Sequence, residues 1–449
     1  MSYDTIVVGA GFGGLKTARD LAAAGQTVLL LEGGTRIGGR AYSRKSAAAE
    51  HLQVEMGGAY LHREHHPRLA AELDRYAVPT TAAAEFTHFR HQLGPTALNR
   101  AFPVPGSEAV AVEAAIYTML KDAHRIDLVK GLENQGLDDL DIPLRDYVDA
   151  LNLPPVSKQL LLSWAWNMMG QPAHESSALW AMQFIAAHHC SLLGVVLSID
   201  EVFTNGSGEL VGAIRRDVPH LKLGTVVTEI DQSTSTTRVT VQNGDTFEAE
   251  SVVVATPMNT WKKITFSPPL PERRRLVVEE GHGCRGLKLI IHVRGSQPGV
   301  ACIGDGVLPT LYDYCAVTEN ERLLVGFTDS SSFDPTDVKA VEDAVHHYLP
   351  EADTLGVDYH DWLGDPLFEG PWVSPRVGQF SRVHKELGEP FGRVHFVGSD
   401  VSLAFPGYIE GALETAERAV ESILSPRRYS SRTGQLVNEP GSAHQTMGV

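Results

Sequence analysis

The chain has 449 residues, more than one hydrophobic core usually organises, so two domains are expected. Its 38 Lys and Arg against 55 Asp and Glu give a formal net charge of −17, which disfavours nucleic-acid binding. Few, scattered cysteines without CxxC spacing argue against a disulfide framework or a zinc site and indicate a reducing compartment; they are Cys190, Cys284, Cys302 and Cys315. The chain starts Met-Ser-Tyr-Asp and reaches a strand at once, so we expect no signal peptide and a cytoplasmic location.

The first residues follow the order strand, glycine turn, helix, strand and acid. Residues 3–8 are an apolar run of strand type, and residues 9–14 read Gly-Ala-Gly-Phe-Gly-Gly. A helical pattern covers 15–24, and a second apolar run over 27–31 ends on Glu32. This order is typical of a unit that binds a dinucleotide.

Each part of this unit has a physical role. We expect Gly9 to make the tight turn, Gly11 to let the backbone approach a pyrophosphate, and Gly14 to let the helix lie close to the sheet. The unpaired N–H groups at the helix N-terminus should face the phosphates. Glu32 should accept hydrogen bonds from the adenosine ribose hydroxyls.

A second glycine-arginine turn distinguishes between cofactors. Residues 35–40 read Thr-Arg-Ile-Gly-Gly-Arg, and a nicotinamide-linked enzyme has no need of them. Together with Gly57-Gly58-Ala59-Tyr60, they resemble flavin-dependent amine oxidases. The resemblance implies FAD as cofactor, with Gly39 close to it, Arg40 reaching its phosphates and residues 57–60 forming the next flavin segment. It also implies an α/β fold, in which a Rossmann-like FAD-binding domain carries an inserted α+β substrate domain.

Helical patterns dominate the chain from residue 67 to residue 199, apart from strand-like pieces at 80–102. The expected helices span 67–76, 107–130, 142–151 and 157–169. Residues 177–199 lack Asp, Glu, Lys and Arg, yet Gln183 and two histidines favour a buried helix followed by a strand over a membrane span.

Strand patterns dominate from residue 226 onward. An antiparallel meander with a hairpin turn at Asn243-Gly244 is expected, and we assign Val227 within it to the cofactor site. The expected strands are 226–230, 238–241, 246–250, 251–257, 286–293, 323–327 and 393–397, with helices at 337–348 and from 406 onward.

These patterns divide the chain into interleaved segments. The FAD-binding domain is expected to comprise 1–80, 205–285 and 388–424, and the substrate domain 81–204 and 286–387. Residues 425–449 are polar and aperiodic, which predicts a peripheral tail.

The last strand and last helix carry further flavin residues by resemblance. Gly398 and Asp400 follow the strand, where an acid can accept a hydrogen bond from the ribityl chain; related enzymes usually have glutamate. The helix N-terminus at Gly407, Tyr408 and Ile409 should point at the flavin pyrimidine ring and stabilise the negative charge of reduced flavin.

Three residues are assigned to catalysis by resemblance. Lys288 matches the lysine that amine oxidases bridge by water to flavin N5, where it can help oxygen react; an edge-strand lysine facing water is the alternative. Trp372 and Tyr408 align with the aromatic pair that holds the substrate amine by cation–π attraction, and core packing is the alternative. Pro371 stands where some relatives carry a cysteine bonded to FAD, so non-covalent FAD is expected.

Histidines gather in an HxxHH cluster at His62, His65 and His66 and in pairs at 188–189 and 346–347. With no partner acids in matching order, we expect no metal site.

Several segments resemble family members that oxidise (S)-6-hydroxynicotine, and they are 57–76, 101–115, 164–172, 308–315, 365–390 and 397–417. The likeness implies that Asn167 and Tyr312 hold a hydroxypyridine ring, while Trp372 and Tyr408 face the amine. Ala301 departs from the glutamate expected at its position, so any role of that carboxylate is lost. The implied reaction transfers a hydride to flavin N5, with O2 as acceptor and H2O2 as by-product. The resulting iminium hydrolyses to 6-hydroxypseudooxynicotine.

Three alternatives remain open. The chain could oxidise another amine, such as pseudooxynicotine or a polyamine, although a diamine site would favour acids where Trp166-Asn167 and Trp372 stand. A nicotinamide-linked dehydrogenase is disfavoured by the flavin segments. A non-catalytic module with an FAD fold is disfavoured by Lys288, Trp372 and Tyr408. The expected partners are a small amine and O2, with no nucleic acid and no membrane span, and a homodimer is left open.

Overall fold

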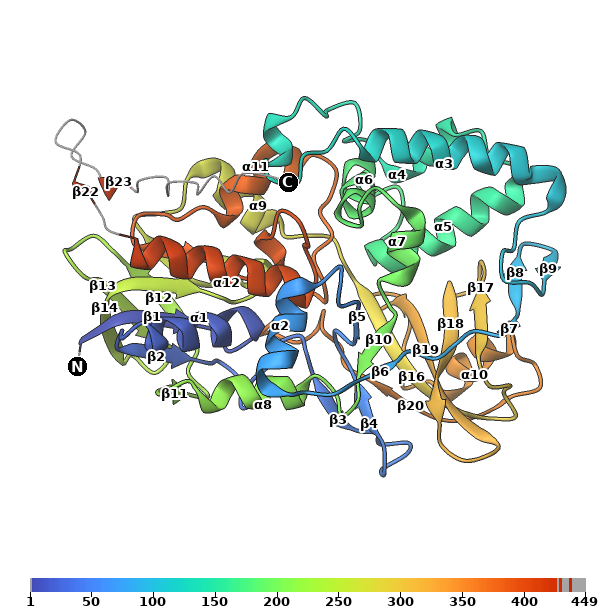
Figure 1. Cartoon of the computed structure of the whole chain (residues 1–449), viewed down its shortest axis with the longest axis horizontal. Helices are drawn as coiled ribbons and strands as arrows, with labels where there is room; N and C mark the ends of the chain where they lie inside the picture. Colours follow the sequence, from blue (N-terminus) through green and yellow to red (C-terminus); the bar gives the residue numbers. More distant parts are fainter. Residues whose placement is uncertain (1, 426–427, 430–435, 438–449) are drawn as a thin grey trace, which may run out of the picture.

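The computed structural model describes residues 2–425, 428–429 and 436–437. Its two largest sheets, one of eight strands and one of six, lie toward opposite ends of the long axis (Figure 1). The helices between residues 109 and 197 gather above the six-stranded sheet. The predicted tail at 425–449 lies outside the described residues except for Ser425 and two short paired strands, β22 (Arg428–Tyr429) and β23 (Leu436–Val437).

An eight-stranded sheet has a parallel part with continuous apolar strands, as expected of a sheet covered on both faces. Val8 pairs with Leu31 on one side and with Val254 on the other, so the carboxyl ends of three strands meet at one edge. The parallel strands are β11 (Leu221–Lys222), β2 (Val28–Leu31), β1 (Ser2–Val8), β14 (Thr246–Val254) and β21 (Val394–Phe396). The predicted meander follows as β12 (Val227–Asp231), β13 (Thr237–Val241) and β14, and β15 (Thr265–Ser267) closes the sheet.

Helices α1 (Phe12–Ala23) and α12 (Ile409–Leu424) pack side by side against this sheet, near α8 (Gly208–Arg216) and α2 (Pro67–Tyr76). Their apolar faces share one core with β1 and β2. Both α1 and α12 begin at the sheet edge described above, so their N-termini face the same region.

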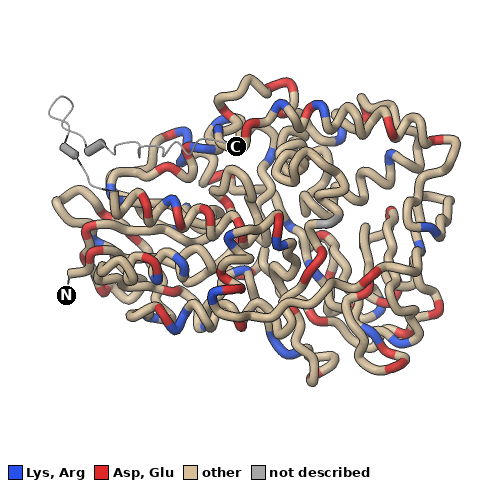
Figure 2. The backbone as a smooth tube through the Cα atoms, viewed as in Figure 1, with Lys and Arg blue, Asp and Glu red and all other residues tan. Residues whose placement is uncertain are grey.

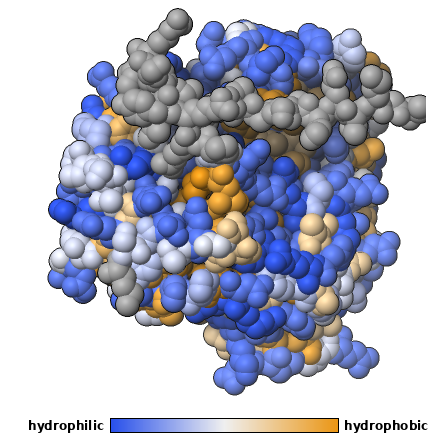
Figure 3. Space-filling model, turned by 60° about the vertical axis from the view of Figure 1, so that its left-hand side comes forward, coloured by the Kyte–Doolittle hydropathy of each residue, from blue (hydrophilic) through white to orange (hydrophobic). Residues whose placement is uncertain are grey.

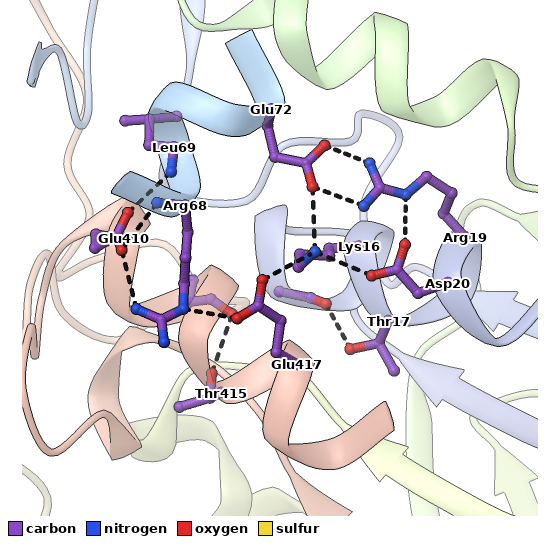
Figure 4. Close-up of polar contacts among 12 residues, drawn as sticks. Lys16, Thr17, Arg19, Asp20, Arg68, Leu69, Glu72, Glu410, Thr415 and Glu417 are labelled. Carbon is purple, nitrogen blue, oxygen red and sulfur yellow. Dashed lines mark hydrogen bonds and ion pairs between the residues drawn. The ribbon is translucent and has the colours of Figure 1, made fainter. Parts of the chain in front are cut away.

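A buried charged cluster ties α2 to α1 and α12 (Figure 4). Glu72 of α2 receives hydrogen bonds from Lys16 and Arg19 of α1. Glu410, only 1% exposed, accepts from the backbone N–H groups of Arg68 at 3.2 Å and Leu69 at 2.9 Å. Helix α2 has no side-chain cap of its own, so a carboxylate of α12 caps it instead.

A six-stranded sheet forms the second large unit, with α10 (Val338–His346) packed on it. Its order is β20 (Asp353–Tyr359), β16 (Gly286–Arg294), β19 (Glu321–Asp329), β18 (Thr310–Ala316), β17 (Val300–Ile303) and β7 (His88–Phe89). The nearby helices are α3 (Ala109–Ala123), α4 (Leu144–Ala150), α5 (Pro155–Met169), α6 (Ala178–Ala187) and α7 (Leu192–Leu197). The smaller strands and remaining helices are β3 (Ser43–Lys45), β4 (Gln53–Glu55), β5 (Tyr60–Leu61), β6 (Thr80–Ala82), β8 (His91–Leu93), β9 (Thr96–Leu98), β10 (Glu201–Phe203), α9 (Glu272–Glu280) and α11 (Phe380–Gly388).

Two helix predictions were wrong in part. The helix predicted at 107–130 is shorter and spans Ala109–Ala123. Beyond its end, the side chain of Gln135 hydrogen-bonds both the N–H and the C=O of Asp127 in a loop. Residues 177–199 form two helices rather than a helix and a strand. His189 and Cys190 adopt left-handed backbone angles and break the run, and the Ser191 side chain caps α7.

Acidic and basic residues are interspersed along the elements of the chain (Figure 2). The face turned forward in Figure 3 is mostly hydrophilic, with separate hydrophobic patches. Among the described helices, none has both the length and the apolar character needed to cross a membrane.

Candidate active site

A cavity of about 1100 Å³ extends from the edge of the eight-stranded sheet to the six-stranded sheet. It brings together residues from segments far apart in the sequence. The predicted site residues that line it are Gly9, Gly11, Glu32, Gly39, Arg40, Gly57, Gly58, Ala59, Tyr60, Asn167, Val227, Lys288, Tyr312, Trp372, Gly398, Gly407, Tyr408 and Ile409. The other two predicted site residues, Gly14 and Asp400, do not line the cavity.

The N-terminus of α1 forms one wall of the cavity. Its N-cap residue is Gly11, and no side chain caps the first turn, so its N–H groups are available to a ligand. A Cβ on Gly14 would collide with the carbonyl of Gly9, which explains why the helix can approach the strand so closely. A Cβ on Gly11 would stand in the lining itself, 3.9 Å from Cα of Gly39. These glycines form a cradle that larger residues would fill.

Glu32 and Arg36 place opposite charges at this end of the cavity. The Glu32 carboxylate accepts hydrogen bonds from the N–H groups of Ala10 and Gly34, both at 2.7 Å. The Arg36 guanidinium donates to Gly39 O at 2.7 Å and lies 4.1 Å from the Tyr42 ring centroid. Its buried Nη2 has no protein partner. Arg36 was not predicted as a site residue, although it stands in the glycine-arginine turn at residues 35–40.

Arg40 and Asp400 bind each other rather than standing free. Arg40 Nη2 donates to Asp400 at 2.7 Å, and Arg40 Nη1 donates to Pro371 O at 2.8 Å. The second Asp400 oxygen accepts from Met258 N at 3.0 Å. The Arg40 guanidinium counteracts the effect of burial and leaves the pKa of Asp400 below its usual value. Asp400 therefore does not line the cavity itself but binds Arg40, which does. Arg40 also holds the backbone of Pro371, the residue before Trp372.

A second helix N-terminus completes this half of the cavity. Helix α12 has Tyr408 as its N-cap residue, without a side-chain cap, and Gly407 reaches its turn with φ of +82°. The buried hydroxyl of Thr256 also lines the cavity without a protein partner. Two uncapped helix ends, a glycine cradle, an acid and an unpaired arginine fit a dinucleotide cofactor that carries a pyrophosphate and a ring that gains negative charge on reduction.

Lys288 lies inside the structure rather than at a sheet edge. It sits on β16, a strand that pairs with β19 on one side and β20 on the other, and the residue is 5% exposed. Nζ donates to Gly57 O at 3.2 Å and lies 5.8 Å from the Tyr60 ring centroid. Burial lowers the pKa of Lys288 to about 8, against a raising effect of Glu55. The surface alternative for this lysine is therefore wrong.

Trp372 is held in a slot made by two glycines. A Cβ on Gly286 or on Gly170 would collide with its indole. Its Nε1 donates to Met168 O at 2.9 Å, and its rings lie at 80° to Phe327 with centroids 6.1 Å apart. A Cβ on Gly407 would lie 3.6 Å from Cβ of Trp372, which places the start of α12 beside it.

The histidine cluster packs behind Tyr408. The ring of His66 lies 5.3 Å and that of His188 5.7 Å from the Tyr408 ring, and His65 lies 5.1 Å from His189. Burial lowers the pKa of His66 to about 3 and that of His188 to about 4, so both stay neutral near pH 7. No group of three or more His, Cys, Asp or Glu in the described part of the chain is arranged to hold a metal ion.

The far end of the cavity is polar at Asn167 and Tyr312. Thr310 Oγ1 donates to Asn167 Oδ1 at 2.9 Å, a contact that sequence reasoning missed. Tyr312 lies between Tyr60 and Phe86, and burial raises its pKa. Ala301 pairs with Tyr312 across β17 and β18 and lines the cavity beside it.

The chain belongs to the family of flavin containing amine oxidoreductases, whose family model matches residues 12–424. The protein is an FAD-dependent amine oxidase with the mixed α/β fold of that family. It is 71% identical over 422 residues to (S)-6-hydroxynicotine oxidase of Paenarthrobacter nicotinovorans, covering 94% of this chain and 99% of that relative. Pseudooxynicotine dehydrogenase of a Pseudomonas species is 28% identical over 437 residues, covering 95% of this chain and 87% of the relative.

The solved structure of wild-type putrescine oxidase bound to putrescine superposes with a TM-score of 0.85 at 21% identity. The match covers 94% of this chain and 99% of that one. At this identity the likeness shows the fold alone.

Proposed function

We propose that this protein oxidises the pyrrolidine ring of (S)-6-hydroxynicotine, with O2 as electron acceptor. The relative that shares 71% of its residues carries that substrate in its name. The observation that supports the proposal most directly is the far end of the cavity, where Asn167 and Tyr312 offer an amide and a hydroxyl. A hydroxypyridine in its pyridone form offers an N–H donor and a C=O acceptor to such groups.

The cradle of Gly9, Gly11 and Gly39 would hold the FAD pyrophosphate, and Glu32 would accept from the ribose. Arg36 supplies an unpaired donor close by. FAD, when bound, would supply the acceptor for a hydride from the carbon next to the amine nitrogen, and its reoxidation by O2 with uptake of one proton would yield H2O2. The helix dipole at Tyr408 and Ile409 would favour the extra negative charge.

The remaining chemistry belongs to the side chains at the amine. Trp372 and Tyr408 would hold the amine and exclude water around the reacting carbon. The amine must lose its proton so that its lone pair assists, and the iminium product then hydrolyses in water to 6-hydroxypseudooxynicotine. Lys288, close to Gly57, would assist the reaction with O2.

The domain division, 1–80 with 205–285 and 388–424 against 81–204 with 286–387, is part of the same proposal. The strands of the eight-stranded sheet all come from the first set of segments, and those of the six-stranded sheet all come from the second, which supports this division. A reducing cytoplasm fits the four cysteines, which are free thiols. A homodimer is left as an open option.

The test compares kcat/KM for (S)-6-hydroxynicotine and nicotine. A site built to pair polar ring atoms leaves them unpaired when the 6-hydroxyl is missing. One lost pairing of about 1–3 kcal/mol predicts a preference of roughly ten- to a hundredfold for the hydroxylated amine. Asn167→Leu should shrink that preference and leave FAD content unchanged. Equal values on the unaltered enzyme would remove the hydroxypyridine assignment and leave a general amine oxidase.

A further inference from the structure

Gln171 connects two chain segments that line opposite ends of the cavity, one carrying Asn167 and the other carrying Trp372. Helix α5 carries Asn167 in its last turn and ends at Met169, and Gly170 turns the chain with φ of +60°. Gln171 follows directly and is 1% exposed. Its side chain contacts residues 371–376, which we call the Trp372 strap.

The amide of Gln171 binds the strap through three contacts. Its Nε2 lies 2.8 Å from Ser374 Oγ, 3.0 Å from Pro375 O and 3.3 Å from Ser374 O. Its Oε1 is buried and has no protein partner. A buried amide that leaves its own oxygen unpaired is costly, so packing alone does not account for a glutamine here.

A second tie joins the same two segments. Trp372 Nε1 donates to the backbone oxygen of Met168, the residue next to Asn167. At the other side of α5, Thr310 of β18 donates to the Asn167 amide at 2.9 Å. Asn167, proposed to bind the substrate ring, and Trp372, proposed to bind the amine, are thus linked through Met168.

We propose that Gln171 is a positioning residue that fixes the separation between Asn167 and Trp372, and so makes the enzyme select amines that carry a polar ring. The inference rests on the proposed function. Only a substrate that touches both ends gains from a fixed separation, because small displacements of bound groups are costly in rate. Nicotine has no 6-hydroxyl to pair at the Asn167 end, so its oxidation depends on the Trp372 end alone.

The test uses Gln171→Met, which keeps the size of the side chain and removes the three contacts. The measured quantities are KM and kcat for (S)-6-hydroxynicotine and for nicotine, with flavin content per chain as the check on folding. Gln232→Met is the matched control, because Gln232 also binds backbone groups, at Phe391 O and Arg393 N, beyond the cavity lining. Ser374→Ala removes one of the three acceptors and serves as a milder variant.

We expect Gln171→Met to lower kcat/KM for (S)-6-hydroxynicotine about tenfold or more, through a fall in kcat as well as a rise in KM, and to change nicotine by less than about threefold. Ser374→Ala should shift the ratio in the same direction by less, and Gln232→Met should leave it unchanged. An equal fall on both amines would show that Gln171 only supports Trp372 and would overturn the inference. An unchanged ratio in a Gln171→Met or Ser374→Ala enzyme that retains its flavin would do the same. If the unaltered enzyme shows no preference, the proposed function itself fails, which is a separate outcome.

Discussion

Lys288 is a buried amine whose pKa the folded protein lowers, so that its charge depends on pH near 8. Burial lowers its pKa to about 8 from an ordinary value of 10.5, because the charged form loses water. Between these two pH values the unfolded chain binds this proton and the folded protein does not. The contribution of Lys288 to the free energy of unfolding therefore rises as the pH increases from about 8 to 10.5. At neutral pH the folded protein holds a cation at this position at some cost in stability, which suggests that the charge serves function.

This gives a prediction for the reaction with O2. We expect reoxidation of the reduced enzyme to slow as pH rises through about 8, where Lys288 loses its proton. Lys288→Met should be slow at every pH and should lose this dependence. Stopped-flow measures reoxidation, and reduction by excess amine under nitrogen is the internal control, expected to change less. Matching rates for both half-reactions in the variant and the unaltered enzyme would remove Lys288 from the oxygen chemistry.

Pro371 makes a simpler prediction at the same scale. A proline has no group that could bond to the flavin, and its carbonyl already accepts from Arg40 at 2.8 Å. FAD should therefore be released when the protein is precipitated with acid, and the yellow colour should appear in the supernatant. Colour retained in the pellet after washing would mean a covalent attachment elsewhere.

Some of these residues could be found from the sequence and others could not. Gly9, Gly11 and Glu32 were predicted because their roles depend on a short strand–turn–helix unit. Thr310 and Gln171 were missed because their partners lie 143 and about two hundred residues away. Arg36 stands inside a recognised motif, but only the structure shows that Arg40 is occupied by Asp400 and that Arg36 Nη2 is free.

At the scale of elements, the start of α12 is fixed by its attachment to α2. Glu410 follows Ile409, a cavity residue, and its carboxylate caps α2 through the backbone of Arg68 and Leu69. His66, just before α2, packs on Tyr408. The orientation of α12 at the cavity therefore depends on α2, a neighbouring helix none of whose residues lines the cavity.

We expect Glu410→Ala to destabilise the protein by about 2–4 kcal/mol, because buried N–H groups and a guanidinium lose their acceptor. Thermal unfolding followed by flavin fluorescence should show a lower midpoint. Glu417→Ala is the control, since its carboxylate also binds Arg68 but is 46% exposed, and it should cost less than about 1 kcal/mol. Similar midpoints for the two variants would mean that the cap does not hold α2 in place.

Element boundaries were harder to predict where side chains compete with the backbone. Residues 177–199 were expected to form a helix followed by a strand, yet Ser191 caps a second, short helix there. Apolar composition alone does not separate a short buried helix from a strand. In contrast, the long patterns of α2 and α12 were periodic enough to be assigned as helices.

At the scale of the whole molecule, the cavity joins a glycine-lined sheet edge to an aromatic chamber. The first half is lined by backbone N–H groups and glycines, which suit a dinucleotide. The second half is lined by Trp372, Tyr408 and Tyr312, with Asn167 at its end. The two kinds of lining could be expected from the order of the motifs in the sequence. The contact between α5 and the Trp372 strap could be found only in the folded chain.

The most direct test of this account mixes the purified yellow enzyme with (S)-6-hydroxynicotine in the absence of O2 and follows flavin absorbance. We predict rapid bleaching that saturates with substrate concentration, much slower bleaching with nicotine, and none with putrescine. Admitting O2 should restore the colour and release H2O2, with 6-hydroxypseudooxynicotine as product. A flavin that stays oxidised with (S)-6-hydroxynicotine but bleaches with putrescine would contradict the account.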